Sequence, residues 1–311
     1  QLMRFRRRVG LGYGAFWRGI LIDREYKHLS DVVTQSQRYF GDFNDGAHFL
    51  RGNSDYKWVW PTGEELLLRH LKHPSDYDDV HGHEYPYIAW NELTKHPTSE
   101  LYDAMMSTNR SSFMPERDTP KHADGSYATP DGKPLPPIPL EVFATTNPYG
   151  PGFLWVKKKS IMPAPVGTVV RKTMRVFNPR TQQEEDVTKS QVAIFGSYKE
   201  NPHLDPKYVM ELESVKDPVK RAAWLNGSWA IAAGGSFDDL WRPGIHVVPR
   251  FPVPFSWWID RSFDWGSTHP FSVGWWAEAN GEEIRLPGGR TFCPAAGSLI
   301  LFHEWYGTEE V

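Results

Sequence analysis

The sequence predicts an α/β fold with two domains, and three observations carry this prediction. Short apolar runs typical of buried strands alternate with segments of helical spacing along the first 110 residues. The chain has 311 residues, which corresponds to about two domains of roughly 150 residues each. A proline-rich stretch at 244–257 is followed by a new series of strand patterns, so we place the domain boundary there.

The first part of the chain contains short apolar runs, each bounded by turn-forming residues. We expect strands there at 16–22, 47–50, 57–60, 87–90 and 140–146. Leu29, Val32 and Val33 recur at helical spacing and predict a helix after the first strand. Three consecutive leucines lie within 64–70, where we expect a second helix.

The remaining segments differ in composition. Residues 114–140 are rich in Pro, Asp, Gly and Lys and predict a surface excursion, whereas 160–190 are polar and predict an irregular segment. Apolar residues on one face predict a helical region at 206–226. After the proline-rich linker we expect strands at 258–264, 271–279 and 298–304.

Composition excludes several classes of protein. There are 35 Lys and Arg against 38 Asp and Glu, and the formal charge of −3 excludes a uniformly basic nucleic-acid binder but permits a local basic channel. A single cysteine excludes a disulfide scaffold and a cysteine-based zinc cluster, and it fits a reducing interior. No apolar run approaches the ~18 residues needed to cross a bilayer, so we expect no membrane-spanning segment.

Two strand ends carry residues suited to nucleotide hydrolysis. The strand at 87–90 leads into Asn91 and Glu92, and a rigidly held carboxylate can orient water against a γ-phosphate or hold Mg²⁺ through water. Thr145, Thr146 and Asn147 end another strand, where ligands of open α/β sheets bind. A solvated strand end and an ordinary Asn-Pro turn are the alternative interpretations.

A second set of residues is suited to metal-dependent cleavage. Asp264 and Glu304 each lie near the end of a predicted strand, and carboxylates on neighbouring strands can clamp two divalent ions about 4 Å apart. Such a pair activates water for phosphodiester cleavage. Asp260 is a competing ligand, because it lies on the same strand face as Asp264, and a structural role is the alternative for both. Lys157, Lys158 and Lys159 are candidates for phosphate contact.

In their order along the chain, these pieces resemble the large terminase subunit of tailed bacteriophages, the motor that packages DNA into procapsids. Residues 19–31 resemble the strand and helix after its phosphate-binding loop, and 87–93 resemble its Walker B strand. Residues 144–157 resemble its coupling motif and give the most specific match. The passage into its nuclease domain is similar to 225–229, 235–237 and 263–266.

The resemblance implies a more detailed domain organisation. Residues 1–243 would form a P-loop-type, additional-strand ATPase domain with a parallel sheet and a helical C-terminal subregion. A linker at 244–257 would lead into the start of an RNase H-like α/β nuclease domain at 258–311. The phosphate-binding loop would precede residue 1 and the nuclease domain would be cut short. We therefore expect the chain to be an internal piece of a longer protein, which by itself neither hydrolyses ATP efficiently nor cuts DNA well.

The resemblance also assigns roles to individual residues. Glu92 would be the catalytic glutamate of ATP hydrolysis, and Asn91 stands where the family usually has a magnesium-associated Asp. Arg110 matches a commonly basic position and would contact phosphate or a neighbouring subunit. Coupling of hydrolysis to DNA movement would fall to Thr145, Thr146 and Asn147, and the two metal-binding nuclease carboxylates would be Asp264 and Glu304.

Cofactors and partners follow from the same resemblance. We expect ATP with Mg²⁺ at the first site and Mg²⁺ or Mn²⁺ at the second. Expected partners are double-stranded DNA, the portal protein and procapsid, the small terminase subunit and further copies of the chain in a ring, with no membrane. The location would be the host cytoplasm, with transient binding at the portal vertex. Two alternatives stay open: a stand-alone RNase H-like nuclease, and a degenerate ATPase-fold module that binds DNA or capsid without catalysis.

Overall fold

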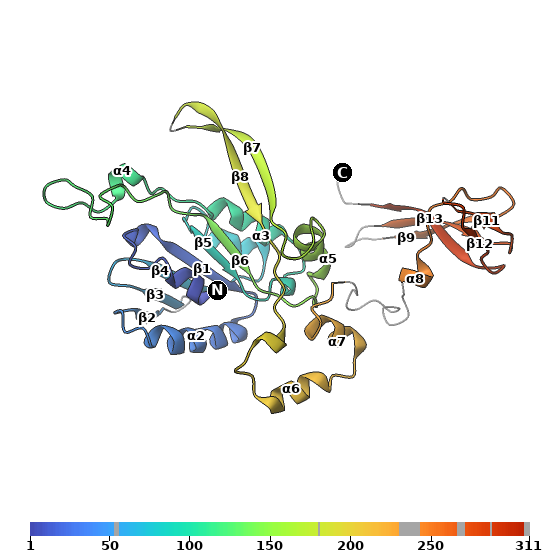
Figure 1. Ribbon diagram of the computed structural model, residues 1–311, viewed down its shortest axis with the longest axis horizontal. Coiled ribbons are helices and arrows are strands. Elements are labelled where there is room, and N and C mark those ends of the chain that lie inside the picture. Colours follow the sequence, from blue (N-terminus) through green and yellow to red (C-terminus); the bar gives the residue numbers. More distant parts are fainter. Residues whose placement is uncertain (53–55, 180, 230–242, 266–270, 287, 308–311) are drawn as a thin grey trace. The chain divides into compact units, whose positions relative to one another are not determined.

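The computed structural model describes residues 1–311 apart from 53–55, 180, 230–242, 266–270, 287 and 308–311 (Figure 1). The chain divides into two compact units, residues 1–239 and 240–311. Among the described helices, none combines the length and apolar character that crossing a bilayer requires. The first unit mixes helices with a largely parallel sheet, which confirms the α/β class; the assignment of the two units to an ATPase and a nuclease domain stays a prediction.

A six-stranded sheet with the order β2-β3-β4-β1-β5-β6 forms the centre of the first unit. The strands β4, β1, β5 and β6 run parallel to one another, whereas β2 and β3 pair antiparallel at one side. Consequently the carboxyl ends of these four parallel strands share one edge of the sheet. The strand bounds are β1 (Arg18–Asp23), β2 (His48–Arg51), β3 (Tyr56–Val59), β4 (Glu65–His70), β5 (Tyr87–Trp90) and β6 (Glu141–Ala144).

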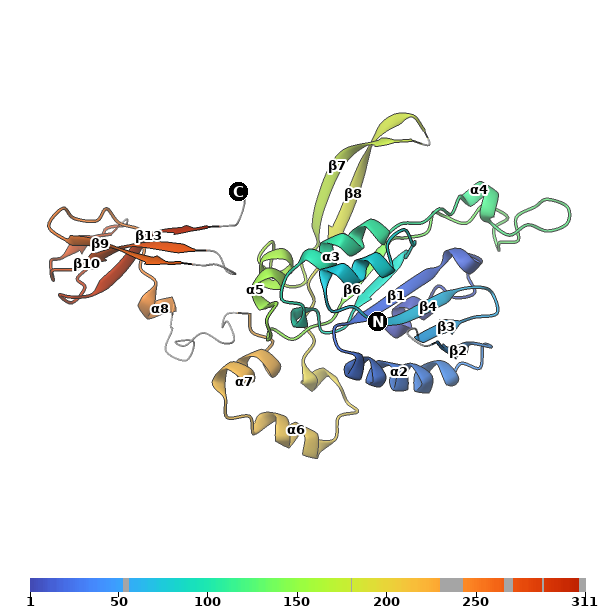
Figure 2. The ribbon, with the colours of Figure 1, turned by 180° about the vertical axis from the view of Figure 1, so that it is seen from behind.

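Two hydrophobic clusters cover the two faces of this sheet, because successive strand residues point to opposite sides. In β1, Leu21 belongs to the cluster that includes α2 (Tyr26–Gly41), while Ile20 and Ile22 belong to the cluster that includes α3 (Glu100–Met105). The two helices lie on opposite faces of the sheet (Figures 1 and 2). Burial on both faces explains why the central strands read as continuous apolar runs.

The leucine-rich segment expected to be a helix is instead the strand β4, and that prediction is wrong. Leu66 and Leu68 pack into the cluster beneath α2, whereas Leu67 packs into the other. A central parallel strand needs apolar residues at every position, and a short apolar run has no period that separates it from a buried helix.

The segment expected to be irregular forms a long two-stranded ribbon, β7 (Val170–Asn178) paired antiparallel with β8 (Gln183–Gln191). The ribbon projects from the first unit (Figures 1 and 2), and nearly all of its described residues are exposed. With neither face buried, the ribbon has no apolar-polar alternation by which the sequence could reveal it. The helical region expected at 206–226 is divided into α6 (Pro206–Glu213) and α7 (Pro218–Trp224).

Shorter helical segments complete the first unit. Residues 114–140 are a largely exposed excursion, as expected, with one helical turn, α4. The bounds are α1 (Leu2–Arg6), η1 (Gly14–Phe16), η2 (Pro74–Asp79), η3 (Leu93–Lys95), η4 (Met106–Thr108), α4 (Pro115–Asp118), α5 (Phe153–Val156), η5 (Lys157–Ile161) and η6 (Tyr198–Glu200).

The second unit contains an antiparallel sheet with the order β13-β10-β9 and a small pair, β11 with β12. The three strands expected at 258–264, 271–279 and 298–304 form as β9, β10 and β13. The bounds are α8 (Pro243–His246), β9 (Trp258–Asp264), β10 (Ser272–Glu278), β11 (Ile284–Arg285), β12 (Thr291–Phe292) and β13 (Leu299–Tyr306).

Candidate active site

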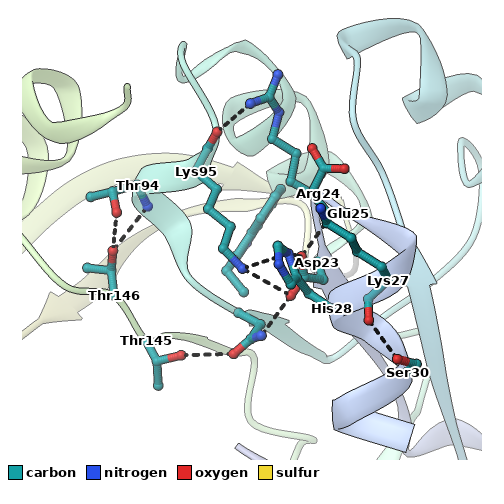
Figure 3. Close-up of polar contacts among 12 residues, drawn as sticks. Asp23, Arg24, Glu25, Lys27, His28, Ser30, Thr94, Lys95, Thr145 and Thr146 are labelled. Atoms are coloured by element: carbon teal, nitrogen blue, oxygen red, sulfur yellow. Dashed lines mark hydrogen bonds and ion pairs between the residues drawn. The ribbon is translucent and has the colours of Figure 1, made fainter. Parts of the chain in front are cut away.

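A fully buried carboxylate, Asp23, lies at the carboxyl end of β1. Burying a charge is costly unless it is hydrogen-bonded and paired. Asn91 donates from Nδ2 to Asp23 Oδ2 at 2.7 Å, and the Glu25 amide donates to Oδ1 at 2.9 Å. Lys95 Nζ lies 3.7 Å from Oδ2, and His28 Nδ1 lies 4.0 Å from Oδ1 (Figure 3). Asp23 is thus the centre of a compact polar cluster.

Asn91 connects this cluster to the neighbouring strands. It follows β5, and its amide continues the ladder by donating to the Ile22 carbonyl at 2.8 Å. Its side-chain carbonyl, Oδ1, accepts a long 3.5 Å hydrogen bond from Thr145 Oγ1, just after β6. Gln1 Nε2 also donates to Thr145 Oγ1, at 2.9 Å. Polar contacts therefore run across the carboxyl ends of three adjacent parallel strands.

Glu92 is held in an unusual backbone conformation at the same edge. Its φ of 52° and ψ of 61° place it in the left-handed region, which non-glycine residues seldom occupy. Such a conformation costs about 1–3 kcal/mol and clusters at functional sites. The half-buried Glu92 thus turns the chain sharply from β5 into η3 at the edge where Asp23 and Asn91 meet.

Thr94 joins the loop after β5 to the loop after β6. It is 1% exposed, and its Oγ1 lies 2.7 Å from Thr146 Oγ1 and 2.7 Å from the Tyr149 carbonyl (Figure 3 shows the Thr146 contact). The Thr94 carbonyl accepts from the Gly152 amide at 2.8 Å. A second backbone bond connects the Leu93 amide to the Thr145 carbonyl at 2.9 Å.

Glycine allows these two loops to touch backbone to backbone. A Cβ at Gly152 would lie 2.1 Å from the His96 carbonyl oxygen and 2.7 Å from Trp155 Nε1. A Cβ at Gly150 would lie 2.9 Å from the Thr94 carbonyl, and Gly150 also has a φ of +121°. Hence the two loops pack as one body, and both glycines are required for the contact.

The structure brings most of the predicted nucleotide-site residues together. Asn91, Glu92, Thr145 and Thr146 share the carboxyl edge, and the Asn147 carbonyl accepts from Thr94 Oγ1 at 3.1 Å. The roles of these residues at a nucleotide stay predictions.

Arg110 lies elsewhere. It donates to the Gly82 carbonyl at 2.9 Å and lies 3.9 Å from Glu84, both of which precede β5, so it belongs to the amino-terminal end of that strand. It is therefore not brought together with Glu92, although an interface role for Arg110 stays a prediction.

The three candidate lysines differ from one another. Lys157 Nζ lies 5.5 Å from the ring centroid of Phe153, and Lys159 pairs with Asp103. Lys158 is exposed. Two of the three lysines therefore already have partners within the first unit, and Lys158 is the one best placed for an external phosphate.

In the second unit, Asp264 and Glu304 lie on the strands that flank β10, and not on neighbouring strands as expected. Asp264 pairs with Ser272, and Glu304 pairs with Gly274, so both carboxylates project from the same face of the sheet as these two residues. Asp260 shares this face. Among the residues described, no group of three or more His, Cys, Asp or Glu side chains is arranged to hold a metal. The metal-binding role of Asp264 and Glu304 stays a prediction.

From the sequence alone, we did not predict Asp23, Lys95, Thr94 or Gly152 as site residues. Like Glu92, Asp23 is a carboxylate that follows a buried apolar run, so the same pattern could have identified it. Lys95 and Thr94 carry no comparable signal, because their contacts come from β1 and from the loop after β6.

No family model matches the sequence, and no curated protein does so. Similar solved structures include the large terminase from a thermophilic bacteriophage in complex with ADP, with 13% identity and a TM-score of 0.46 over 98% of this chain and 59% of that chain. A second crystal form of that terminase gives 15% identity and 0.47 over 98% and 59%. Its complex with ATP-gamma-S gives 14% and 0.45 over 98% and 58%. This chain thus spans less than two thirds of those structures.

Proposed function

We propose that the chain is part of a viral DNA-packaging motor, whose first unit couples ATP hydrolysis to DNA translocation. The observation that supports this best is the polar connection across the carboxyl ends of β1, β5 and β6, from Asp23 through Asn91 to Thr145. Ligands of open parallel sheets bind at this edge. The strained Glu92 adds a half-buried carboxylate there.

In this proposal each residue has one task at the bound nucleotide. Glu92 orients the attacking water and accepts its proton, which requires a carboxylate held rigidly by the backbone. Asp23 fixes the orientation of Asn91 by accepting from Nδ2, which leaves Asn91 Oδ1 toward Thr145. Mg²⁺ neutralises phosphate charge when bound, and the neutral Asn91 amide suits it less well than a carboxylate would.

Coupling would run through the contacts of Thr94. A change at Thr146 would be passed directly to Thr94, and one at Thr145 would reach it through Leu93; Thr94 in turn contacts Gly152 at the start of α5. The lysine-containing segment η5 follows α5. Movement of these lysines would alter the grip on the DNA backbone, so DNA affinity should fall steeply with salt.

The second unit would cut the packaged DNA with Mg²⁺ or Mn²⁺ held by Asp264 and Glu304. Their common face of the sheet supports this role. A second candidate function is a DNA- or capsid-binding module without catalysis, which the amide at Asn91 favours because it removes a metal-binding charge. The portal protein, the procapsid, the small terminase subunit and a ring of further copies remain the proposed partners.

Two substitutions test the division of labour in the complete gene product. Glu92→Gln keeps the side chain's size but removes the base, and should abolish ATP hydrolysis while metal-dependent DNA cleavage persists. Asp264→Ala should have the opposite effect. Loss of both activities from one substitution, in a protein whose circular dichroism is unchanged, would contradict the proposal. Wild-type DNA binding without ATP turnover or cleavage would favour the binding module.

A further inference from the structure

The ribbon of β7 and β8 separates its charges into two halves. The strand residues nearest the turn include three consecutive acidic residues at 184–186 and one cation, Arg175, which forms an ion pair within this half. The half farther from the turn contains Arg171, Lys172 and Lys189 and no acidic residue. The ribbon is thus acidic toward its turn and basic toward the body of the first unit (Figure 1).

The basic half of the ribbon adjoins η5, the segment that carries the three candidate lysines. Gln191 donates from Nε2 to the Lys159 carbonyl at 3.2 Å, so its side chain points toward η5. Side chains alternate along a strand, and Lys189 therefore shares this face of the ribbon with Gln191. Lys172 pairs with Lys189 across the ribbon and lies on the same face. We call Lys158, Lys172 and Lys189 together the basic surface.

The three cations of the basic surface have no carboxylate partner among the described residues. Lys172 and Lys189 stand directly opposite each other, which destabilises the strand pair because like charges repel. All three side chains are exposed, and residues 151–183 contain neither Asp nor Glu. An external anion would neutralise this excess of positive charge, so the arrangement indicates a negatively charged partner.

The arrangement of the basic surface favours an extended polyanion over a single small anion. Its three charges come from three separate segments, because Lys158 belongs to η5 and the other two lysines belong to opposite strands. Duplex DNA presents about one negative charge per 1.7 Å of its axis, so each of these cations can reach a phosphate. Lysine ammonium groups on flexible stems bind phosphates as point charges and do not read base sequence. A two-stranded β-ribbon is also narrow enough to enter the major groove.

We propose that the basic surface binds the phosphate backbone of duplex DNA. Lys172 and Lys189 contact phosphates from the ribbon, and Lys158 contacts them from η5. The acidic residues at 184–186 repel the duplex and confine the contact to the half of the ribbon next to η5. Such a surface serves the proposed function, on which the choice of duplex DNA as the partner rests. It requires neither ATP hydrolysis nor DNA cleavage.

The test is binding of the 311-residue chain to a short labelled DNA duplex, measured by fluorescence anisotropy between about 50 and 200 mM NaCl. Lys172→Gln together with Lys189→Gln should weaken binding about tenfold or more and reduce the slope of log affinity against log salt by about 2. This double variant removes the repulsion between the two strands, so its circular dichroism should match that of the wild type. In the wild type, DNA should also slow amide hydrogen exchange in β7 and β8.

Lys27→Gln together with Arg38→Gln is the matched control, because it removes two exposed positive charges from α2 and should leave DNA affinity unchanged. Polyglutamate should displace the labelled duplex far less well than unlabelled duplex of equal charge. The proposal is overturned if the ribbon variant binds DNA as tightly as the wild type, if the wild type does not bind at about 50 mM NaCl, or if polyglutamate competes as well as the duplex. Because the assay contains no nucleotide, a missing ATP turnover would contradict the proposed motor without changing any of these results.

Discussion

The contact between the loops after β5 and β6 predicts that Gly152→Ala is strongly destabilising. The added Cβ would lie 2.1 Å from the His96 carbonyl oxygen, 2.7 Å from Trp155 Nε1 and 3.0 Å from the Thr94 carbonyl oxygen. Two of these three atoms are backbone oxygens, which cannot rotate away. The backbone of Gly152 itself, at φ −87° and ψ 4°, is accessible to alanine, so the cost in the folded state is steric.

The size of the effect follows from what must move. Separating the loops enough to admit a methyl group weakens the Gly152 amide bond to Thr94 and the bond from Trp155 Nε1 to the His96 carbonyl, both 2.8 Å long. Overpacking costs about 1–3 kcal/mol, and each weakened buried hydrogen bond costs about 1 kcal/mol. Alanine also lowers the conformational entropy of the unfolded chain, which offsets about 0.4–1 kcal/mol of this loss. The net loss is about 2–4 kcal/mol.

Urea unfolding followed by tryptophan fluorescence measures this loss, and we expect the midpoint to fall by about 1 M or more. Gly41→Ala is the matched control, because a Cβ at Gly41 meets no atom within 4 Å; its unfolding midpoint should be unchanged or slightly higher. An unfolding midpoint for Gly152→Ala within error of the wild type would refute the close packing of the two loops.

Three further predictions concern the same edge of the sheet. Thr94→Val should lower the free energy of unfolding by about 1–3 kcal/mol because it leaves buried acceptors unpaired, whereas Thr34→Val on the exposed face of α2 should cost much less in the same urea experiment. Asn91→Asp places a second carboxylate against Asp23, so the urea midpoint of unfolding should fall, and millimolar MgCl₂ should partly restore it. Equal stability of this variant with and without magnesium would contradict a metal role. His96 binds its proton more weakly when folded, with a pKa of about 4 against 6.5 unfolded; stability should therefore fall by up to about 3 kcal/mol from pH 7 to pH 4, and His96→Phe should flatten this part of the pH profile.

The central strands could be predicted from the sequence because parallel strands covered on both faces are continuous apolar runs. This signal identified β1 and β5. It failed for β4, whose three leucines are equally compatible with a buried helix, since a run of this length has no measurable period. The ribbon of β7 and β8 was not predicted, because neither of its faces is buried and it therefore lacks the apolar run of a core strand.

Strand-end residues of the candidate site were predictable for the same reason as the strands. Asn91 and Thr145 directly follow apolar runs, and the parallel order of β5 and β6 brings them to one edge. The partners that fix them were not predictable. Thr94 acts through contacts with residues more than 50 positions away along the chain, and Gly152 matters only because the His96 carbonyl approaches it.

The rigidity of this junction restricts how the proposed motor can move. Thr94, Gly150 and Gly152 fasten the loop after β5 to the loop after β6 by hydrogen bonds and by contacts that leave no room for a side chain. Packed contacts of this kind have discrete arrangements and do not deform smoothly. In the proposed motor, a movement that starts at Glu92 would therefore not be absorbed between the two loops and would continue into α5 and the lysine-bearing η5. If the proposed function holds, coupling would depend on the stiffness of the contacts at Gly150 and Gly152 as much as on the chemistry at the nucleotide.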